Sequence, residues 1–154
     1  MTAFFNEKNF PALQAAATGW IGTPFIKGAA VQGAGVDCVH LVGEIYRECG
    51  FLDDYQFPNY TLDEGSHLAL SKVIAWVESS GKFLLLEKTE AIQGGDLLCF
   101  QYRSAVVHHV GLAVSSSDFV HCMRRISVIN AKLEDSTYKR ILRGVYRPIR
   151  KEEQ

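Results

Sequence analysis

The stretch that decides the fold is DCVHLVGEIYREC, which spans residues 37–49. Asp37 is a residue type that caps helix N-termini, and Gly50, directly after the stretch, is one that ends helices. Four residues between them recur at helical spacing and share one apolar face: Cys38, Val42, Ile45 and Cys49. The pattern predicts a helix over 38–49 whose first turn carries Cys38, with the thiol pointing toward the layer on which the helix packs.

A thiol at this position has a chemical use. The positive end of the helix dipole favours the thiolate, and a neighbouring imidazole can accept the thiol proton. We therefore expect the pKa of Cys38 to lie below the ordinary value of about 8.5, although the carboxylate of Asp37 acts in the opposite direction. The alternative is an ordinary core thiol, which is our expectation for the other three cysteines: Cys49, Cys99 and Cys122.

The imidazole is expected from HHVGLAV, residues 108–114. Alternation along a strand places His109 on one face together with the small residues that follow it, against which we expect a helix to pack closely, and places His108 on the other face. If the next turn contains three residues, 115–117, His121 lies diagonally across from His109 and within reach of its ring. A turn with an even number of residues would put the two rings on opposite faces.

Cys38, His109 and His121 form a candidate set of nucleophile, base and orienting group, since a polar partner on the far ring nitrogen holds a catalytic imidazole in place. A competing interpretation is that the cysteine and the histidines are core residues with satisfied hydrogen bonds. A third is a zinc site, which strand geometry disfavours because adjacent residues point to opposite faces; its ligands would be His108, His109, His121 and Cys122.

Outside these motifs the pattern places helices before strands. Amphipathic periodicity predicts helices over 9–19 and 66–79, and the segments beside the central helix are a glycine-rich loop (22–36) and an aromatic loop (51–62). Apolar and alternating runs then predict strands over 82–86, 96–101, 106–114, 119–123, 126–131 and 140–147. This order favours a single α+β domain, residues 1–154, with a mostly antiparallel sheet.

The composition argues against several classes of partner. The 154 residues carry 16 Lys and Arg against 17 Asp and Glu, and this net charge of −1 argues against nucleic acid as the main partner. One basic group is interpreted as the solvated side of a strand and its tail: Lys139, Arg140, Arg143, Arg147, Arg150 and Lys151. No apolar run reaches the roughly 18–20 residues of a membrane span, and the first residues lack a signal-peptide pattern, so we expect synthesis in the cytoplasm.

Five short motifs follow one another along the chain: GTPF (22–25), DCVHLV (37–42), GGDLLCF (94–100), HVGLAV (109–114) and FVHC (119–122). In this order, over residues 13–128, they resemble the NlpC/P60 family of cysteine peptidases. WIGTPF (20–25), the DCVHLV variant and Asn59-Tyr60 are most similar to the phage and gene-transfer-agent cell-wall peptidase branch of that family.

The resemblance implies a papain-like α+β fold in which the nucleophile helix packs on the sheet. Cys38 would attack an amide carbonyl of a bacterial peptidoglycan stem peptide, between D-glutamate and a diamino acid. His109 would accept the thiol proton, His121 would hold His109, and the backbone N–H of Cys38 would stabilise the oxyanion. No metal or organic cofactor is implied. Phage tail-tip proteins are the implied partners, and a tail particle acting at the cell wall is the implied location.

Four residues are expected beside the substrate or the oxyanion: Phe25, Asp37, Val39 and His108. Phe25 stands where the family usually has Tyr, so a hydroxyl is missing beside the thiol, and Val39-His40 replaces the usual Ser-Gly, which leaves recognition of the substrate amine open. His40 points away from Cys38 and is expected at the surface or the cleft rim. Two other functions stay open: a thiol acyltransferase or amidase on another substrate, and a non-catalytic tail-assembly or cell-wall-binding module.

Overall fold

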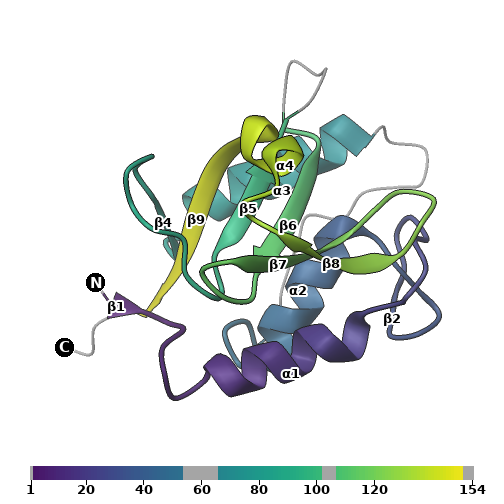
Figure 1. The fold of residues 1–154 in the computed structure, drawn as a ribbon, viewed down its shortest axis with the longest axis horizontal. Helices are drawn as coiled ribbons and strands as arrows, with labels where there is room; N and C mark the ends of the chain where they lie inside the picture. Colours follow the sequence, from purple (N-terminus) through teal and green to yellow (C-terminus); the bar gives the residue numbers. More distant parts are fainter. Residues whose placement is uncertain (1, 54–65, 102–106, 151–154) are drawn as a thin grey trace.

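The structure, a computed structural model, describes residues 2–53, 66–101 and 107–150. It is built around one curved sheet with helices on both faces (Figure 1). The helices are α1 (Phe10–Trp20), α2 (Cys38–Glu48), α3 (Ser66–Ser79) and α4 (Ser136–Ile141). The strands are β1 (Thr2–Ala3), β2 (Ala30–Val31), β3 (Gly35–Val36), β4 (Phe83–Leu85), β5 (Leu97–Phe100), β6 (His109–Ala113), β7 (Asp118–Cys122), β8 (Val128–Lys132) and β9 (Leu142–Arg150).

The main sheet has the strand order β1-β9-β5-β6-β7-β8, and β4 also pairs with β9. The pairings within this sheet are antiparallel, so the expected α+β class is confirmed. The first strand and the last are neighbours, which brings the two ends of the described chain together at one edge of the sheet (Figure 1). In the described segments, no helix combines the length and the apolar character that a membrane crossing requires.

Helix α2 forms as its sequence predicts. The side chain of Asp37 caps it by accepting a 2.9 Å hydrogen bond from the backbone N–H of His40, and Gly50 ends it with a φ of 77°. The inward side chains Leu41, Val42 and Ile45 are each no more than 1% exposed. Full burial of such a side chain stabilises a fold by about 1.5–3 kcal/mol, so α2 is held firmly on β6 and β7.

The sheet separates two hydrophobic cores. The larger lies between the sheet and helices α1, α2 and α3, and includes Leu112 and Val120 from the middle of the sheet. The smaller lies on the opposite face, where α4 covers it with Tyr138 and Ile141. Its fully buried members are Leu98, Phe100, Ala113 and Phe119. Alternate residues of β6 and β7 therefore face different cores, as period-two geometry requires.

The predicted helices over 9–19 and 66–79 are confirmed as α1 and α3, with α1 displaced by one residue. The structure adds elements that the pattern does not predict: β1, the β2–β3 hairpin inside the glycine-rich loop, and α4, which occupies the start of the predicted strand 140–147. Residues 54–65, which hold most of the predicted aromatic loop and Asn59-Tyr60, lie outside the described residues.

One residue of the C-terminal basic group is not solvated as expected. Arg147 is only 14% exposed and forms a paired contact with the buried carboxylate of Asp96, from Nε at 3.0 Å and from a terminal nitrogen at 2.8 Å. Asp96 also accepts a 2.8 Å hydrogen bond from the backbone N–H of Gln93. The pair links β9 to the residue before β5. The sequence pattern predicts Arg147 on the solvent side of its strand, whereas the side chain points to the interior and meets Asp96 there.

Candidate active site

Cys38 is the first residue of α2, which meets the sheet where β6 begins. Its side chain is partly exposed, and the backbone N–H groups of Val110 and Val39 are near enough to its sulfur to favour the thiolate form and lower the pKa of Cys38. Val110 directly follows His109 in β6. The start of the helix and the start of the strand therefore meet, with Cys38 packed on the larger core and the His109 ring against Phe100 of the smaller core.

The surroundings of Cys38 disfavour a free thiolate. Burial raises the pKa of the Cys38 thiol to about 12, the carboxylate of Asp37 adds to the increase, and the backbone hydrogen bonds from Val110 and Val39 only partly oppose it. The expectation of a lowered thiol pKa is therefore wrong for the free protein, because desolvation outweighs the helix dipole. In the free protein the raised pKa favours the neutral thiol of Cys38 over the thiolate.

His109 and His121 are hydrogen-bonded to each other as predicted. Val114 and Asp118 pair across a three-residue turn, which sets Leu112 opposite Val120 and places His121 diagonal to His109 on one face of the sheet. The Nε2 atom of His109 lies 2.8 Å from the Nδ1 atom of His121. This bond leaves Nδ1 of His109 as the ring nitrogen available for a proton from another group.

Both imidazoles of this pair are neutral near pH 7. Burial, with smaller contributions from His121 and His108, lowers the pKa of His109 to about 3. Burial alone lowers the pKa of His121 to about 4. His121 is 0% exposed, and its Nε2 atom has no hydrogen-bond partner. Because both rings are neutral, the pair carries no positive charge that would stabilise a thiolate.

The small face of β6 has a different partner from the one expected. The sequence predicts a close helix there, but α2 packs on the opposite face of β6, beside Val110 and Leu112. A Cβ atom on Gly111 would lie 3.1 Å from the Phe119 ring and 3.3 Å from Cβ of His121. Gly111 therefore makes room for the side chains of the neighbouring strand β7, His121 among them.

Asp37 is 4% exposed and is fully engaged at the start of α2. One carboxylate oxygen, Oδ1, accepts the capping hydrogen bond from the backbone N–H of His40, and it also lies 2.7 Å from Nδ1 of the His40 ring. The other oxygen accepts a 2.8 Å hydrogen bond from the backbone N–H of Gly28. His40 is therefore half-buried against Asp37, and Asp37 ties the glycine-rich segment to the helix that carries Cys38.

The other residues expected near the substrate take different positions. Phe25 is half-buried, forms an isolated bridge with Val36 and packs on the larger core. The side chain of Val39 is buried and lines an internal apolar space, so only its backbone N–H reaches the Cys38 sulfur. His108 is half-buried, and its backbone N–H donates a 3.1 Å hydrogen bond to the carbonyl of Phe100.

The remaining thiols are free, as expected. Cys99 and Cys122 are buried, and Cys122 donates a 3.3 Å hydrogen bond to the carbonyl of Val36. Within the described residues, no three His, Cys, Asp or Glu side chains converge on a point that could hold a metal ion. The zinc interpretation therefore lacks a ligand set in this part of the chain.

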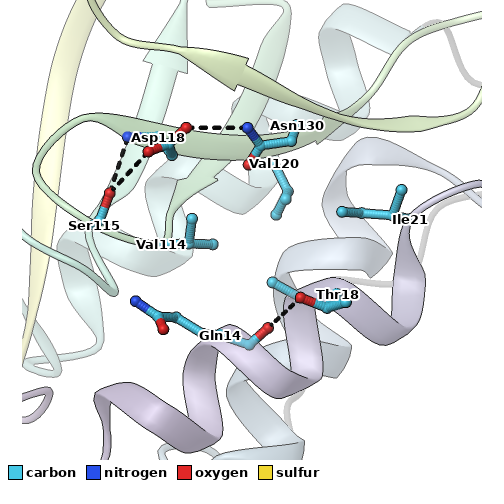
Figure 2. Close-up of a pocket in the computed structure, with 9 residues that line it drawn as sticks. Gln14, Thr18, Ile21, Val114, Ser115, Asp118, Val120 and Asn130 are labelled. Atoms are coloured by element: carbon cyan, nitrogen blue, oxygen red, sulfur yellow. Dashed lines mark hydrogen bonds between the residues drawn. The ribbon is translucent and has the colours of Figure 1, made fainter.

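A separate pocket of about 220 Å³ lies between α1 and the turn that joins β6 to β7 (Figure 2). At its rim, Ser115 accepts a 3.0 Å hydrogen bond from the backbone N–H of Asp118, and Asn130 donates a 3.1 Å hydrogen bond to the Asp118 carboxylate. The same carboxylate is bonded to Lys132, and these contacts hold its pKa well below the ordinary range. The pocket lies at the opposite end of β6 from His109, and its hydrogen bonds fix the turn that sets the His109–His121 register.

One residue that contacts the histidine pair gives no signal in the sequence. The Tyr138 ring of α4 meets the His121 ring at 5.0 Å between centroids and 90° between planes. Helix α4 has six residues, none of them fully buried, so no apolar period marks it. Phe100 also contacts the pair, with its ring centroid 5.8 Å from that of His109.

The comparisons with known proteins support the fold. No protein-family description matches the chain, and no curated protein sequence matches it. Solved structures do. A lipoprotein-like NLP/P60 family protein from Staphylococcus aureus subsp. aureus Mu50 matches with a TM-score of 0.65 and 20% identity, over 96% of this chain and 43% of the other.

Two further structures agree. The NlpC/p60 domain of the peptidoglycan hydrolase SagA matches with a TM-score of 0.56 and 20% identity, over 89% of this chain and 97% of that domain. An NlpC/P60 family protein from Bacillus cereus ATCC 10987 matches with a TM-score of 0.61 and 21% identity, over 92% of this chain and 42% of the other. The chain thus spans less than half of the S. aureus and B. cereus proteins, and it has the NlpC/P60 fold.

Proposed function

We propose that this chain is a cysteine peptidase that hydrolyses amide bonds in bacterial peptidoglycan stem peptides. The observation that carries the proposal is the 2.8 Å hydrogen bond between His109 and His121 at the corner where α2 presents Cys38. A neutral imidazole held by a second polar group, on a strand whose next residue, Val110, adjoins the thiol, is an arrangement that nucleophilic catalysis can use. A peptidoglycan hydrolase domain among the matching structures supports the choice of substrate.

The proposed reaction begins with a neutral Cys38 thiol, because the pKa of about 12 keeps it protonated at rest. As the sulfur attacks the amide carbonyl, Nδ1 of His109 takes the thiol proton, and the carbonyl π electrons move to the oxygen. The backbone N–H of Cys38, at the positive end of α2, stabilises the resulting oxyanion. His109 then gives the proton to the departing amine, the C–N bond breaks, and a thioester remains.

Water completes the proposed cycle. His109 accepts a proton from the water molecule that attacks the thioester, the C–S bond breaks, and the sulfur leaves as the Cys38 thiol after taking back a proton. The products are a carboxylic acid and an amine. The neutral His109 meets one requirement of this role, since a base must be unprotonated when the thiol or water gives up its proton, whereas its lowered pKa makes it a weak base in the free protein.

The motifs at 20–25 and 37–42 resemble those of the phage and gene-transfer-agent branch. From this resemblance we further propose that the bond cleaved joins D-glutamate to a diamino acid. We also propose that the protein works with tail-tip proteins at the cell wall.

Two findings support a competing function, which is a wall-binding module without turnover. The pKa of Cys38 is raised, and Phe25 offers no hydroxyl beside the thiol.

Digestion of a defined stem peptide separates these two functions. The purified protein is incubated with L-Ala-γ-D-Glu-diaminopimelate, and new amino groups are measured by mass spectrometry. We expect cleavage by the parent protein and none by the Cys38→Ala variant. Cys49→Ala is the matched control, because Cys49 is a half-buried cysteine at the far end of the same helix. Binding of peptidoglycan without any release of amines, by parent and variant alike, would establish the wall-binding module instead.

A further inference from the structure

The side chain of His121 poses a problem that the proposed reaction does not resolve. The side chain is 0% exposed, yet its Nε2 atom has no hydrogen-bond partner. A buried polar atom without a partner destabilises the folded state unless a neighbouring group makes up for the missing hydrogen bond. Which group can do so depends on which nitrogen of each ring carries the proton.

Only two proton arrangements fit a pair of neutral imidazoles joined by one hydrogen bond. In the first, Nε2–H of His109 donates to Nδ1 of His121, so Nδ1 of His109 is bare and the proton of His121 sits on Nε2. In the second, Nδ1–H of His121 donates to Nε2 of His109, so the proton of His109 sits on Nδ1. The second arrangement blocks catalysis, because a protonated Nδ1 cannot accept the Cys38 proton.

The ring of Tyr138 distinguishes the two arrangements. It meets the His121 ring perpendicularly, with centroids 5.0 Å apart, which is the geometry of an edge-to-face contact. An aromatic face carries negative charge density, so it accepts an N–H group and repels a bare nitrogen lone pair. If the face of Tyr138 is the one turned to Nε2 of His121 in this perpendicular contact, an N–H on that nitrogen is favoured and a lone pair is disfavoured.

Tyr138 also keeps this site dry. Its ring packs against Phe119 and Phe100, with centroids 5.0 Å and 6.1 Å away, over the smaller core. On its other side it lines a surface pocket of about 350 Å³, together with Leu133 and Leu142. The ring therefore contacts both the fully buried His121 and the pocket, so it helps to keep water away from Nε2.

We propose that Tyr138 is a positioning residue that selects the catalytic proton arrangement, by presenting its ring face to Nε2–H of His121 and so holding Nδ1 of His109 bare. The effect of this arrangement on catalysis rests on the proposed peptidase function, whereas the arrangement itself can be measured without any turnover. The aromatic face is the active feature, so Phe is expected to replace Tyr138 and an aliphatic side chain is not.

The test is nitrogen NMR of the imidazoles in protein labelled with ¹⁵N-histidine at pH 7, in the Cys38→Ala background. We expect His121 and His109 to carry their protons on Nε2, both with Tyr138 and in Tyr138→Phe, with the Nε2 proton of His121 shifted upfield by the ring. In Tyr138→Leu we expect the Nδ1–H form to appear in both histidines. Leu142→Ala is the control, since it removes packing from the wall of the same pocket and from the same core but leaves Tyr138 in place.

An Nδ1 proton on His121 in the parent spectrum would overturn the proposal, even if Tyr138→Leu fails to fold. An unchanged proton position in folded Tyr138→Leu would also overturn it. With Cys38 restored, Tyr138→Leu should lower kcat about tenfold with little change in KM, and Tyr138→Phe should keep the parent kcat. If neither the parent protein nor any variant cleaves the peptide, the peptidase function is rejected. The proton arrangement is still decided by the NMR experiment.

Discussion

The Nε2 atom of His109 lies 2.8 Å from the Nδ1 atom of His121, and the two residues come from adjacent antiparallel strands. This relationship gives the proposed base a partner on Nε2, and in the proposed reaction its other nitrogen, Nδ1, accepts the proton of Cys38. We expect His121→Leu to lower kcat about 10²–10³-fold, within the range that proton transfer by a side chain contributes, with KM nearly unchanged. Steady-state kinetics on the stem peptide measure both parameters.

The amide variant His121→Asn provides the comparison for that experiment. Its side-chain oxygen can accept the N–H of His109, so it should recover part of the activity that Leu loses. Equal activity of parent and His121→Leu would show that His109 needs no partner on Nε2.

Asp37 is the charged group whose removal should change the reactivity of Cys38. Its carboxylate raises the pKa of the thiol, so Asp37→Asn should lower that pKa by about one unit. Asn retains an oxygen for capping the N–H of His40, which preserves α2. The rate of iodoacetamide labelling of Cys38, followed by mass spectrometry from pH 6 to 11, should therefore rise at a lower pH in the variant. A profile that moves to higher pH would contradict the assigned charge effect.

Acid should destabilise the protein through its buried histidines. The folded pKa values of about 3 for His109 and about 4 for His121 lie below the unfolded value of 6.5, so the unfolded chain binds more protons between these limits. The stability is full above pH 6.5 and is lost as the pH falls from 6.5 toward 4. We expect a loss on the order of 2–3 kcal/mol from His121, measured by urea denaturation at each pH.

His121→Asn is the control for this pH dependence, because Asn does not titrate. The slope between pH 6.5 and 4 should be smaller in that variant. Asp96, whose pKa is raised mainly by burial, acts in the opposite direction when it protonates, so it cannot be the source of the loss. An identical slope in the parent and in His121→Asn would remove His121 as its origin.

The buried pair of Asp96 and Arg147 should be costly to break from one side. Asp96 is 1% exposed, and Arg147→Met would leave its carboxylate without the opposite charge. We expect a decrease of about 3–5 kcal/mol in the free energy of unfolding, measured in urea. The double variant Asp96→Leu with Arg147→Met should regain most of that loss, whereas two additive losses would show that the pair does not act as a unit.

Local signals in the sequence were sufficient for α2 and for the histidine pair. Asp37 and Gly50 mark the two ends of the helix, and the parity of the turn between Val114 and Asp118 decides that His109 and His121 share a face. Both inferences depend only on neighbours along the chain. For that reason they survive without knowledge of how the layers pack.

The features that the sequence could not predict depend on contacts between distant segments. The pKa of Cys38 follows its burial between α2 and β6, which overrides the helix dipole. Gly111 makes room for His121 on β7 rather than for a helix, although small residues look the same in either case. Tyr138 lies on a six-residue helix with no buried side of its own, so its contact with His121 has no local signature.

The protonated state of Cys38 has a further consequence for durability. Peroxide attacks thiolates far more readily than thiols, and sulfinic and sulfonic products are not repaired by ordinary reductants. A cysteine with a pKa of about 12 is therefore a poor target for oxidation while the site is idle. The same burial that disfavours ionisation should let this protein stay in aerated medium with its sulfur unoxidised.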